Sequence, residues 1–217
     1  MLKFYYNSIS ANARRVWVAL LEKQIPFEPI LVNLDGDQFS DEFKLINPLQ
    51  RVPVIIDNGL RVVESLAILD YLEAKYPTPS LMPTEPEAIA TVRMIEMIAV
   101  NELQPCTIPL TKLLVGLKVD AQIVETVRQR VTDIIDFYES LLDGHSYFVQ
   151  NKITLADVVA GTLVPSLSHL GFPLDNYPNL KKWSEQLEQR DSWQETALNP
   201  EMIEAALPNI RAILERR

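Results

Sequence analysis

The sequence has few cysteines, histidines, glycines and basic residues, and each shortage excludes a class of function. Cys106 is the only cysteine among 217 residues, so an intramolecular disulfide and a CxxC redox pair are both excluded, and a reducing compartment is indicated. His145 and His169 are too few and too far apart for a metal site. The six glycines form no phosphate-binding loop. Because 29 acidic residues outnumber 20 basic ones, for a net charge of -9, we expect no nucleic-acid partner.

Long apolar runs are also missing. No segment approaches the ~18 apolar residues of a membrane span, and the first residues lack the apolar stretch of a signal peptide. We therefore expect a cytoplasmic protein that has no membrane partner. Hydrophobic residues nevertheless make up 47% of the chain, which is enough for a substantial core.

The first third of the chain alternates between strand and helix patterns. Apolar and aromatic runs predict strands over 2–6, 30–34, 54–56 and 61–63, and helical spacing of apolar residues predicts helices over 10–23, 40–46 and 65–75. Asn58-Gly59 lies between the last two strands and is the preferred type I′ hairpin turn. The order β-α-β-α-β-β-α predicts a small mixed sheet flanked by helices, an α/β domain over residues 1–76.

Prolines separate this domain from the rest of the chain. Residues 76–86 contain four prolines, which neither continue a helix nor donate to a sheet, and they predict a linker over 77–86. Beyond it, apolar residues recur at helical spacing, so residues 87–217 are predicted to be all-α. We expect Pro105 and Pro109 to kink or end the first helix of this domain, and Gly144 to end the next.

A capping box is predicted at residues 154–157. Thr154 suits the N-cap of a helix, Asp157 suits the third position from which a side chain reaches back, and Ile153 is placed to pack on Val158. We assign this motif to folding rather than to catalysis.

Several short motifs occur one after another in a particular order. They are Ser10-Ala11-Asn12-Ala13-Arg14-Arg15-Val16, Gln38-Phe39-Ser40 with Phe43, Asn47-Pro48, Val52-Pro53, Glu64-Ser65, and Thr154 with Asp157. The ordered set resembles the cytosolic glutathione transferases in both domains, over nearly the whole chain. The segment at Ser10 resembles the active-site segment of the serine classes (zeta, phi, tau and theta), in members of bacterial or plant type.

This resemblance implies an architecture, an activity and a set of partners. Residues 1–76 would be a thioredoxin-like domain that binds glutathione, and residues 87–217 would carry the pocket for a hydrophobic electrophile. The implied protein is a cytoplasmic, homodimeric detoxification enzyme that uses glutathione as co-substrate and needs no metal.

The resemblance also implies the residues that hold glutathione. In the family the peptide bond before the proline of Val52-Pro53 is cis, which turns the backbone of Val52 outward to pair with a bound peptide. Ser65, at a helix start, and Glu64 suit a carboxylate and an amine, although Ser65 could be a plain N-cap and Glu64 an exposed acid. Gln38 would meet the far end of the peptide, or be an exposed loop residue. Arg51 would contribute through its main chain.

Ser10 is the residue to which the resemblance assigns the chemistry. A thiol with a pKa of ~8.5 is mostly protonated at neutral pH, and lowering it by about two units requires roughly 2.7 kcal/mol of thiolate stabilisation. The Ser10 hydroxyl would donate to the sulfur, although it could also be a plain N-cap, a role that would compete for the same oxygen. Asn12 is the second choice. Ser8 fits a shifted alignment, and Tyr5 and Tyr6 are expected in the first strand.

Conjugation of the glutathione thiolate to a small hydrophobic electrophile is the function expected first. Glutathione-dependent isomerisation and peroxide reduction are the alternatives within enzymes. Zeta members that isomerise maleylacetoacetate carry Ser-Ser-Cys where this chain has Ser10-Ala11-Asn12, which disfavours the isomerase. The absence of cysteine from the first domain disfavours a thiol reductase. A non-catalytic binding module is the remaining alternative, but such modules usually lose the peptide-binding residues.

Overall fold

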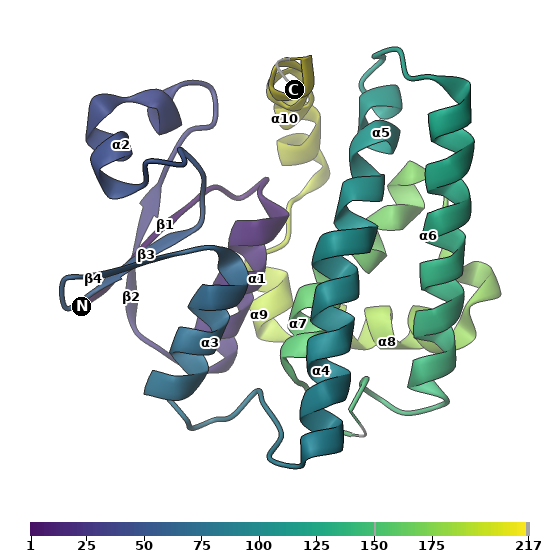
Figure 1. Ribbon diagram of the computed structural model, residues 1–217, viewed down its shortest axis with the longest axis horizontal. Coiled ribbons are helices and arrows are strands. Elements are labelled where there is room, and N and C mark those ends of the chain that lie inside the picture. Colours follow the sequence, from purple (N-terminus) through teal and green to yellow (C-terminus); the bar gives the residue numbers. More distant parts are fainter. Residues whose placement is uncertain (150, 216–217) are drawn as a thin grey trace. The chain divides into compact units, whose positions relative to one another are not determined.

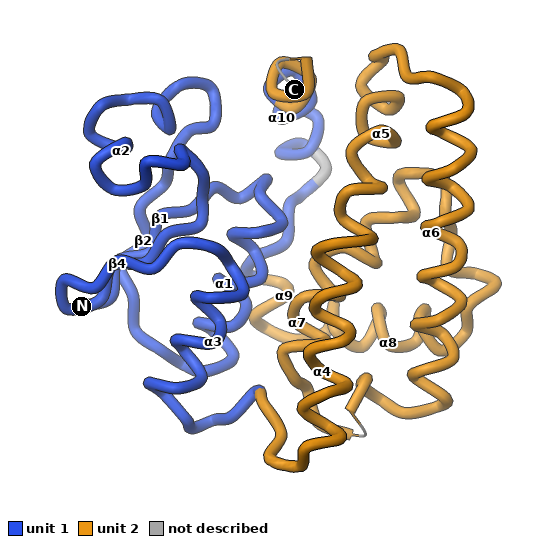
Figure 2. The backbone as a smooth tube through the Cα atoms, in the orientation of Figure 1, with its two compact units in different colours: residues 1–81, 195–209 blue, residues 82–194, 210–217 orange. Residues whose placement is uncertain are grey.

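The computed structural model describes residues 1–149 and 151–215. The chain forms two compact units (Figures 1 and 2), one of residues 1–81 with 195–209 and the other of residues 82–194 with 210–217. We call them the first and the second unit. The predicted boundaries, with a linker over 77–86, stay a prediction.

The first unit contains a four-stranded mixed sheet. Its strands are β1 (Leu2–Tyr6), β2 (Phe27–Leu31), β3 (Val54–Asp57) and β4 (Leu60–Val63), in the order β2-β1-β3-β4. β1 is parallel to β2 and antiparallel to β3, and β3 is antiparallel to β4. The connecting helices are α1 (Ala11–Glu22), the 3-10 turn η1 (Asp37–Phe39), α2 (Asp41–Ile46) and α3 (Ser65–Lys75). This order confirms the predicted α/β class.

Apolar side chains from the strands and from α1 and α3 form the core of this unit. Phe4, Val16, Leu20, Ile55 and Leu72 have no exposed surface. α1 packs beside α3, as Figure 1 shows. Burying a side chain of this size stabilises the fold by about 1.5–3 kcal/mol, and the core therefore holds the sheet and both helix starts in place.

Two local predictions in the first unit had different outcomes. Asn58 and Gly59 have φ angles of 48° and 84°, as the type I′ turn requires, so the hairpin is confirmed. The second strand was predicted at 30–34 but occupies Phe27–Leu31. Pro29, which argues against a strand, is tolerated there because β2 lies at the edge of the sheet, where a missing N–H need not break a ladder.

The second unit is helical, as predicted. Its elements are α4 (Pro86–Ile98), the π-helical segment η2 (Ala99–Leu103), α5 (Gln104–Leu114), α6 (Ala121–Leu142), α7 (Leu155–Gly161), η3 (Val164–Leu170), η4 (Leu174–Asn176), α8 (Pro178–Glu188) and α9 (Asp191–Glu195). The last helix, α10 (Pro200–Glu215), has residues in both units. Among the described residues, none of the helices combines the length and apolar character needed to cross a bilayer.

The prolines of the first long helix do not end it. The helix continues through Pro109 to Leu114, which contradicts the possibility that it stops at Pro105 or Pro109. The π-helical segment Ala99–Leu103 directly precedes Pro105, and a π turn is one of the recognised ways in which a helix accommodates a change in its hydrogen-bond ladder. Gly144, with φ of 80°, comes just after the end of α6 as predicted.

The predicted capping box is present at the start of α7. Asp157 has no exposed surface, and its Oδ2 accepts hydrogen bonds from the backbone N of Thr154 (2.8 Å) and from Thr154 Oγ1 (2.9 Å). Its Oδ1 accepts from the backbone N of Phe148 (3.1 Å) and from Trp183 Nε1 (2.9 Å). Burial raises the pKa of Asp157, and these donors oppose that shift. The carboxylate thus joins α7 to the preceding loop and to α8.

Candidate functional site

The register of the sheet brings four strand ends together in the first unit. Tyr6 pairs with Leu31, Tyr5 with Val54, and Val54 with Val63. Because β3 runs against the other three strands, β1, β2 and β4 finish where β3 begins. We call this place the loop end of the sheet.

The predicted glutathione-binding residues all lie in segments next to the loop end. Ser10 comes after β1, Gln38 after β2, and Glu64-Ser65 after β4, while Arg51-Val52-Pro53 precedes β3. The segments that carry these residues are far apart in the sequence but adjoin the same end of the sheet (Figure 1). Loops at the end of a rigid sheet are a common location for binding residues.

Ser10 is the N-cap of α1. Its backbone is extended, its Oγ accepts a hydrogen bond from the N of Ala13 (3.2 Å), and its own N donates to the carbonyl of Asn7 (3.1 Å). A hydroxyl has one proton to donate and two lone pairs to accept with. The capping bond uses a lone pair, so the proton is left for another acceptor. The two roles that the sequence set in competition are therefore compatible.

The neighbours that competed with Ser10 occupy different environments. Tyr5 and Tyr6 lie in β1 as expected, and the Tyr6 ring meets the Trp17 ring edge-on at 4.9 Å between centroids. Ser8 lies in the turn that leads to α1, and Asn12 lies half-buried in the first turn of that helix. The preference for Ser10 over Asn12 stays a prediction.

The segment before β3 has the backbone that the resemblance implied. The Val52-Pro53 peptide bond is cis, which confirms that expectation. The carbonyl of Arg51 accepts a hydrogen bond from Asn47 Nδ2 (2.7 Å), while the Arg51 side chain is exposed. Val52 is buried and precedes the first register pair of β3, at Val54. The main chain of Arg51, rather than its charge, is therefore what the fold fixes here.

Glu64 and Ser65 form the start of α3. The N-cap is Glu64 and Ser65 is the first helical residue, so the alternative that Ser65 is the cap is wrong. Glu64 is exposed and has φ of 68°, in a region that costs a residue with a side chain of order 1–3 kcal/mol. Its side chain forms no capping hydrogen bond with any described residue. The first N–H groups of α3 are thus left for another acceptor, at the positive end of the helix dipole.

Gln38 is not an exposed loop residue. It lies in η1 with 5% of its surface exposed, and its Nε2 donates to the carbonyl of Leu34 (3.0 Å). Its Oε1 is buried without a hydrogen-bond partner among residues 1–149 and 151–215. A buried acceptor without a donor costs about 1–3 kcal/mol. Gln38 therefore keeps one buried acceptor without a donor in the described part of the chain.

Two asparagines beside these segments were not recognised as site residues from the sequence. Asn7 closes the turn between β1 and Ser10, and Asn47 closes the turn between α2 and Arg51. From the sequence, Asn47 was named only as part of the Asn47-Pro48 motif, and Asn7 was given no role. Asparagine at the first position of a tight turn is a known signal for a side chain that accepts from the backbone two residues on.

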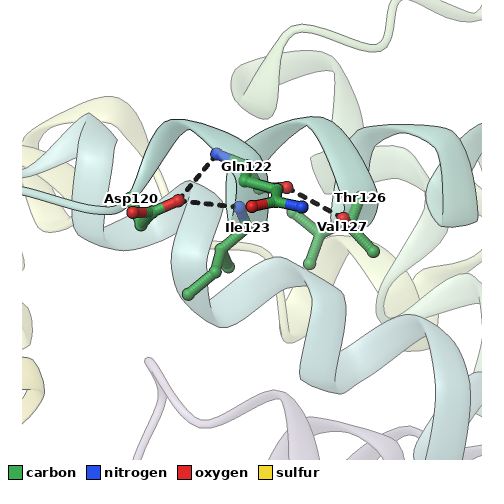
Figure 3. A pocket seen from close by; sticks show the side chains of 5 residues that line it. All are labelled: Asp120, Gln122, Ile123, Thr126 and Val127. Atoms are coloured by element: carbon green, nitrogen blue, oxygen red, sulfur yellow. Dashed lines mark hydrogen bonds between the residues drawn. The ribbon is translucent and has the colours of Figure 1, made fainter.

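The second unit has a shallow surface hollow at the start of α6 (Figure 3). It is lined by Asp120, Gln122, Ile123, Thr126 and Val127. Asp120 caps the helix by accepting from the N of Gln122 (2.8 Å), and Thr126 Oγ1 donates to the carbonyl of Gln122 (2.8 Å). These polar atoms serve the helix itself, and the hollow is open to solvent, so we assign it no ligand.

The side chains that usually bind metals are dispersed in the described part of the chain. Within residues 1–149 and 151–215, no three His, Cys, Asp or Glu side chains are grouped so that they could hold an ion. Cys106 is buried in α5, and burial raises the pKa of its thiol. A buried thiol with a raised pKa is a poor nucleophile.

Comparison with known families agrees with the geometry of both units. The model for the glutathione S-transferase N-terminal domain matches residues 4–80, and the model for the glutathione S-transferase C-terminal domain matches residues 68–191. The chain belongs to the glutathione S-transferase family.

Individual relatives extend over most of the chain. It is 32% identical to the maleylacetoacetate isomerase of Mus musculus, over 82% of this chain and 83% of that one. It is 28% identical to glutathione S-transferase F4 of Arabidopsis thaliana, over 88% and 83%. The crystal structure of a glutathione S-transferase from Rhodospirillum rubrum superposes with a TM-score of 0.78 at 27% identity, over 92% and 94%. The predicted family and fold class are thus confirmed.

Proposed function

We propose that the protein is a glutathione transferase that binds glutathione at the loop end of the first unit's sheet and conjugates its thiolate to small hydrophobic electrophiles. The observation that carries the proposal is that the segments with Ser10, Gln38, Val52 and Ser65 all adjoin that end of the sheet. Family membership supports the same activity. A scaffold protein would have no need to keep all of these residues together.

Each part of glutathione has a group that suits it. The extended peptide would pair with the backbone of Val52, as an added strand does. A carboxylate would lie at the uncapped first turn of α3, near Ser65, and Glu64 would pair with the amine. Gln38 would meet the far end of the peptide. Arg51 would contribute its main chain.

Ser10 would supply the thiolate stabilisation. Its hydroxyl proton would be donated to the sulfur while its oxygen keeps the capping bond from Ala13. The N–H groups of the first turn of α1 would add to this effect. Together these donors would lower the pKa of the thiol, and the thiolate would attack the electrophile and form a carbon–sulfur bond, with release of a leaving group or uptake of a proton.

The remaining expectations belong to the same proposal. Residues 1–76 would form the glutathione-binding domain, and residues 87–217 would supply the electrophile pocket. The protein would act in the cytoplasm, as a homodimer, in detoxification. It would need neither a metal nor a nucleic-acid or membrane partner.

Isomerisation is the second candidate, because a maleylacetoacetate isomerase is among the similar proteins. It would use the same bound thiol. The sequence Ser10-Ala11-Asn12 lacks the second serine and the cysteine that the isomerases carry, and this difference favours conjugation.

One experiment tests the proposal and separates the two candidates. The purified protein is applied to immobilised glutathione and then assayed with an aryl halide, an isothiocyanate, an organic peroxide and maleylacetoacetate. We expect retention and the fastest turnover with one of the first two. Faster turnover of maleylacetoacetate would establish the isomerase instead. The absence of both retention and turnover would rule out the enzymatic function.

A further inference from the structure

The side chain of Asn7 holds the turn that presents Ser10. Its Oδ1 accepts a hydrogen bond from the N of Ile9 (3.1 Å), and its backbone carbonyl accepts one from the N of Ser10 (3.1 Å). Its Nδ2 donates to the carbonyl of Val32 (2.8 Å), just beyond β2. The turn is therefore closed on itself and also fixed to the neighbouring strand.

The side chain of Asn47 has the same bonding pattern at the other segment. Its Oδ1 accepts from the N of Leu49 (3.0 Å), and its carbonyl accepts from the N of Gln50 (2.9 Å). Its Nδ2 donates to the carbonyl of Arg51 (2.7 Å). Asn47 is only 2% exposed, although Leu49 and Arg51 are exposed.

An ordinary asparagine turn explains only half of this pattern. Closing such a turn requires the side-chain oxygen, and serine can do the same, more weakly. The amide nitrogen is not needed for the turn. In Asn7 it reaches the carbonyl of Val32, which fixes the turn to the neighbouring strand, whereas in Asn47 it reaches the carbonyl of Arg51, which fixes the end of its own turn.

The two turns carry different parts of the site. The turn of Asn7 ends at Ser10, whose hydroxyl faces the thiol in the proposed function. The turn of Asn47 ends at Arg51, one residue before the Val52 backbone that pairs with the peptide. A catalytic hydroxyl displaced by a fraction of an ångström loses its bond to the developing charge, whereas a displaced strand edge loses affinity.

We propose that Asn7 and Asn47 are positioning residues with separate effects: Asn7 sets the reactivity of the bound thiol through Ser10, and Asn47 sets the affinity for glutathione through Val52. This inference rests on the proposed function. Neither asparagine touches the reacting atoms, and each acts through the segment that its amide fixes.

The test compares Asn7→Ser with Asn47→Ser, because serine keeps an acceptor for the turn and removes only the amide bond without adding charge. The measurements are the pH profile of conjugation, the KM for glutathione and the kcat. For Asn7→Ser we expect the pKa of the bound thiol to rise by about 0.5–1 unit, a three- to tenfold loss of rate at neutral pH, with KM changed less than about twofold. For Asn47→Ser we expect KM to rise about tenfold, with an unchanged thiol pKa. Asn176→Ala, at an exposed residue of the second unit, should change neither.

Thermal unfolding shows whether a change of fold explains the result. The alanine variants of the two asparagines should change the thiol pKa and the KM in the same directions as the serine variants and by larger amounts. If the alanine variants do not fold, the serine variants alone test the proposal. Changes in both parameters in both variants, or in neither, would overturn the division of roles while leaving a working transferase. A wild-type protein that neither binds nor turns over glutathione would overturn the proposed function and this inference with it.

Discussion

The helix starts at Ser10 and at Thr154 use their polar atoms in opposite ways. At Thr154 both oxygens of Asp157 accept two hydrogen bonds each, and the carboxylate has no exposed surface. At Ser10 a single bond from Ala13 caps the helix, and the hydroxyl proton has no acceptor in the described part of the chain. At Thr154 the polar atoms are satisfied within the fold, whereas Ser10 keeps a donor, as the proposed function requires.

Replacing Asp157, which accepts the hydrogen bonds at the start of α7, should have the largest effect. Asp157→Ala leaves the N–H groups of Phe148, Thr154 and Trp183 buried without an acceptor, and each such group is costly. We expect the free energy of unfolding to fall by about 3–5 kcal/mol, measured by urea denaturation. Asp120→Ala, which removes an exposed N-cap of α6, is the matched control and should cost about 1 kcal/mol. Equal losses of unfolding free energy in the two variants would contradict this role of Asp157.

Removing the Ser10 hydroxyl should affect the rate of conjugation more than the stability of the fold. For Ser10→Ala we expect the pKa of the bound thiol to rise by about 1–2 units, so that the rate at neutral pH falls about 10- to 100-fold and recovers as the pH rises. Binding of glutathione should remain largely intact, and the lost cap should cost about 1 kcal/mol of stability. The pH profile of conjugation measures the shift. An unchanged profile would transfer the role to Asn12 or to the backbone.

The Thr154 hydroxyl should matter only for stability. Thr154→Ala removes one of the four donors to Asp157 and leaves the other three in place, so we expect a loss of about 1–2 kcal/mol in urea denaturation, less than for Asp157→Ala. The pKa of the bound thiol should not change. A shifted thiol pKa in this variant would mean that the two helix starts are not as different as their hydrogen bonds indicate.

The sequence predicted most of the fold because local signals and tertiary structure agree. Asn58-Gly59 and the Thr154 box each had a residue type with one favoured role. The strand at Phe27–Leu31 was misplaced because its tolerance of Pro29 depends on being at the sheet edge, which is a tertiary property. The π-helical segment before Pro105 was not predicted either, because it too depends on tertiary structure.

The sequence identified candidate site residues, whose roles stay a prediction, but it did not predict their geometry. Motifs identified Ser10, Gln38 and Glu64, but burial of Gln38 and the left-handed φ of Glu64 depend on how loops meet at the sheet. The hydrogen bonds of Asn7 and Asn47 were not predicted because their amide partners, Val32 and Arg51, use backbone carbonyls that any residue could supply. A hydrogen bond to a backbone carbonyl requires no particular residue type, so the sequence does not indicate it.

Ser40 offers the smallest expected effect and the most discriminating control. Its Oγ caps α2 by accepting from the N of Phe43 (3.1 Å), almost the same bond that Ser10 accepts from Ala13 (3.2 Å). Ser40→Ala should cost about 1 kcal/mol of stability or less, as the loss of a half-buried cap does, and leave the pKa of the bound thiol unchanged. Since both serine variants lose a similar capping bond, a pKa shift seen only in Ser10→Ala is more than the general effect of losing a helix cap. If Ser40→Ala raised the thiol pKa as much as Ser10→Ala, loss of a cap would explain both, and Ser10 would no longer be distinguished as the thiolate donor.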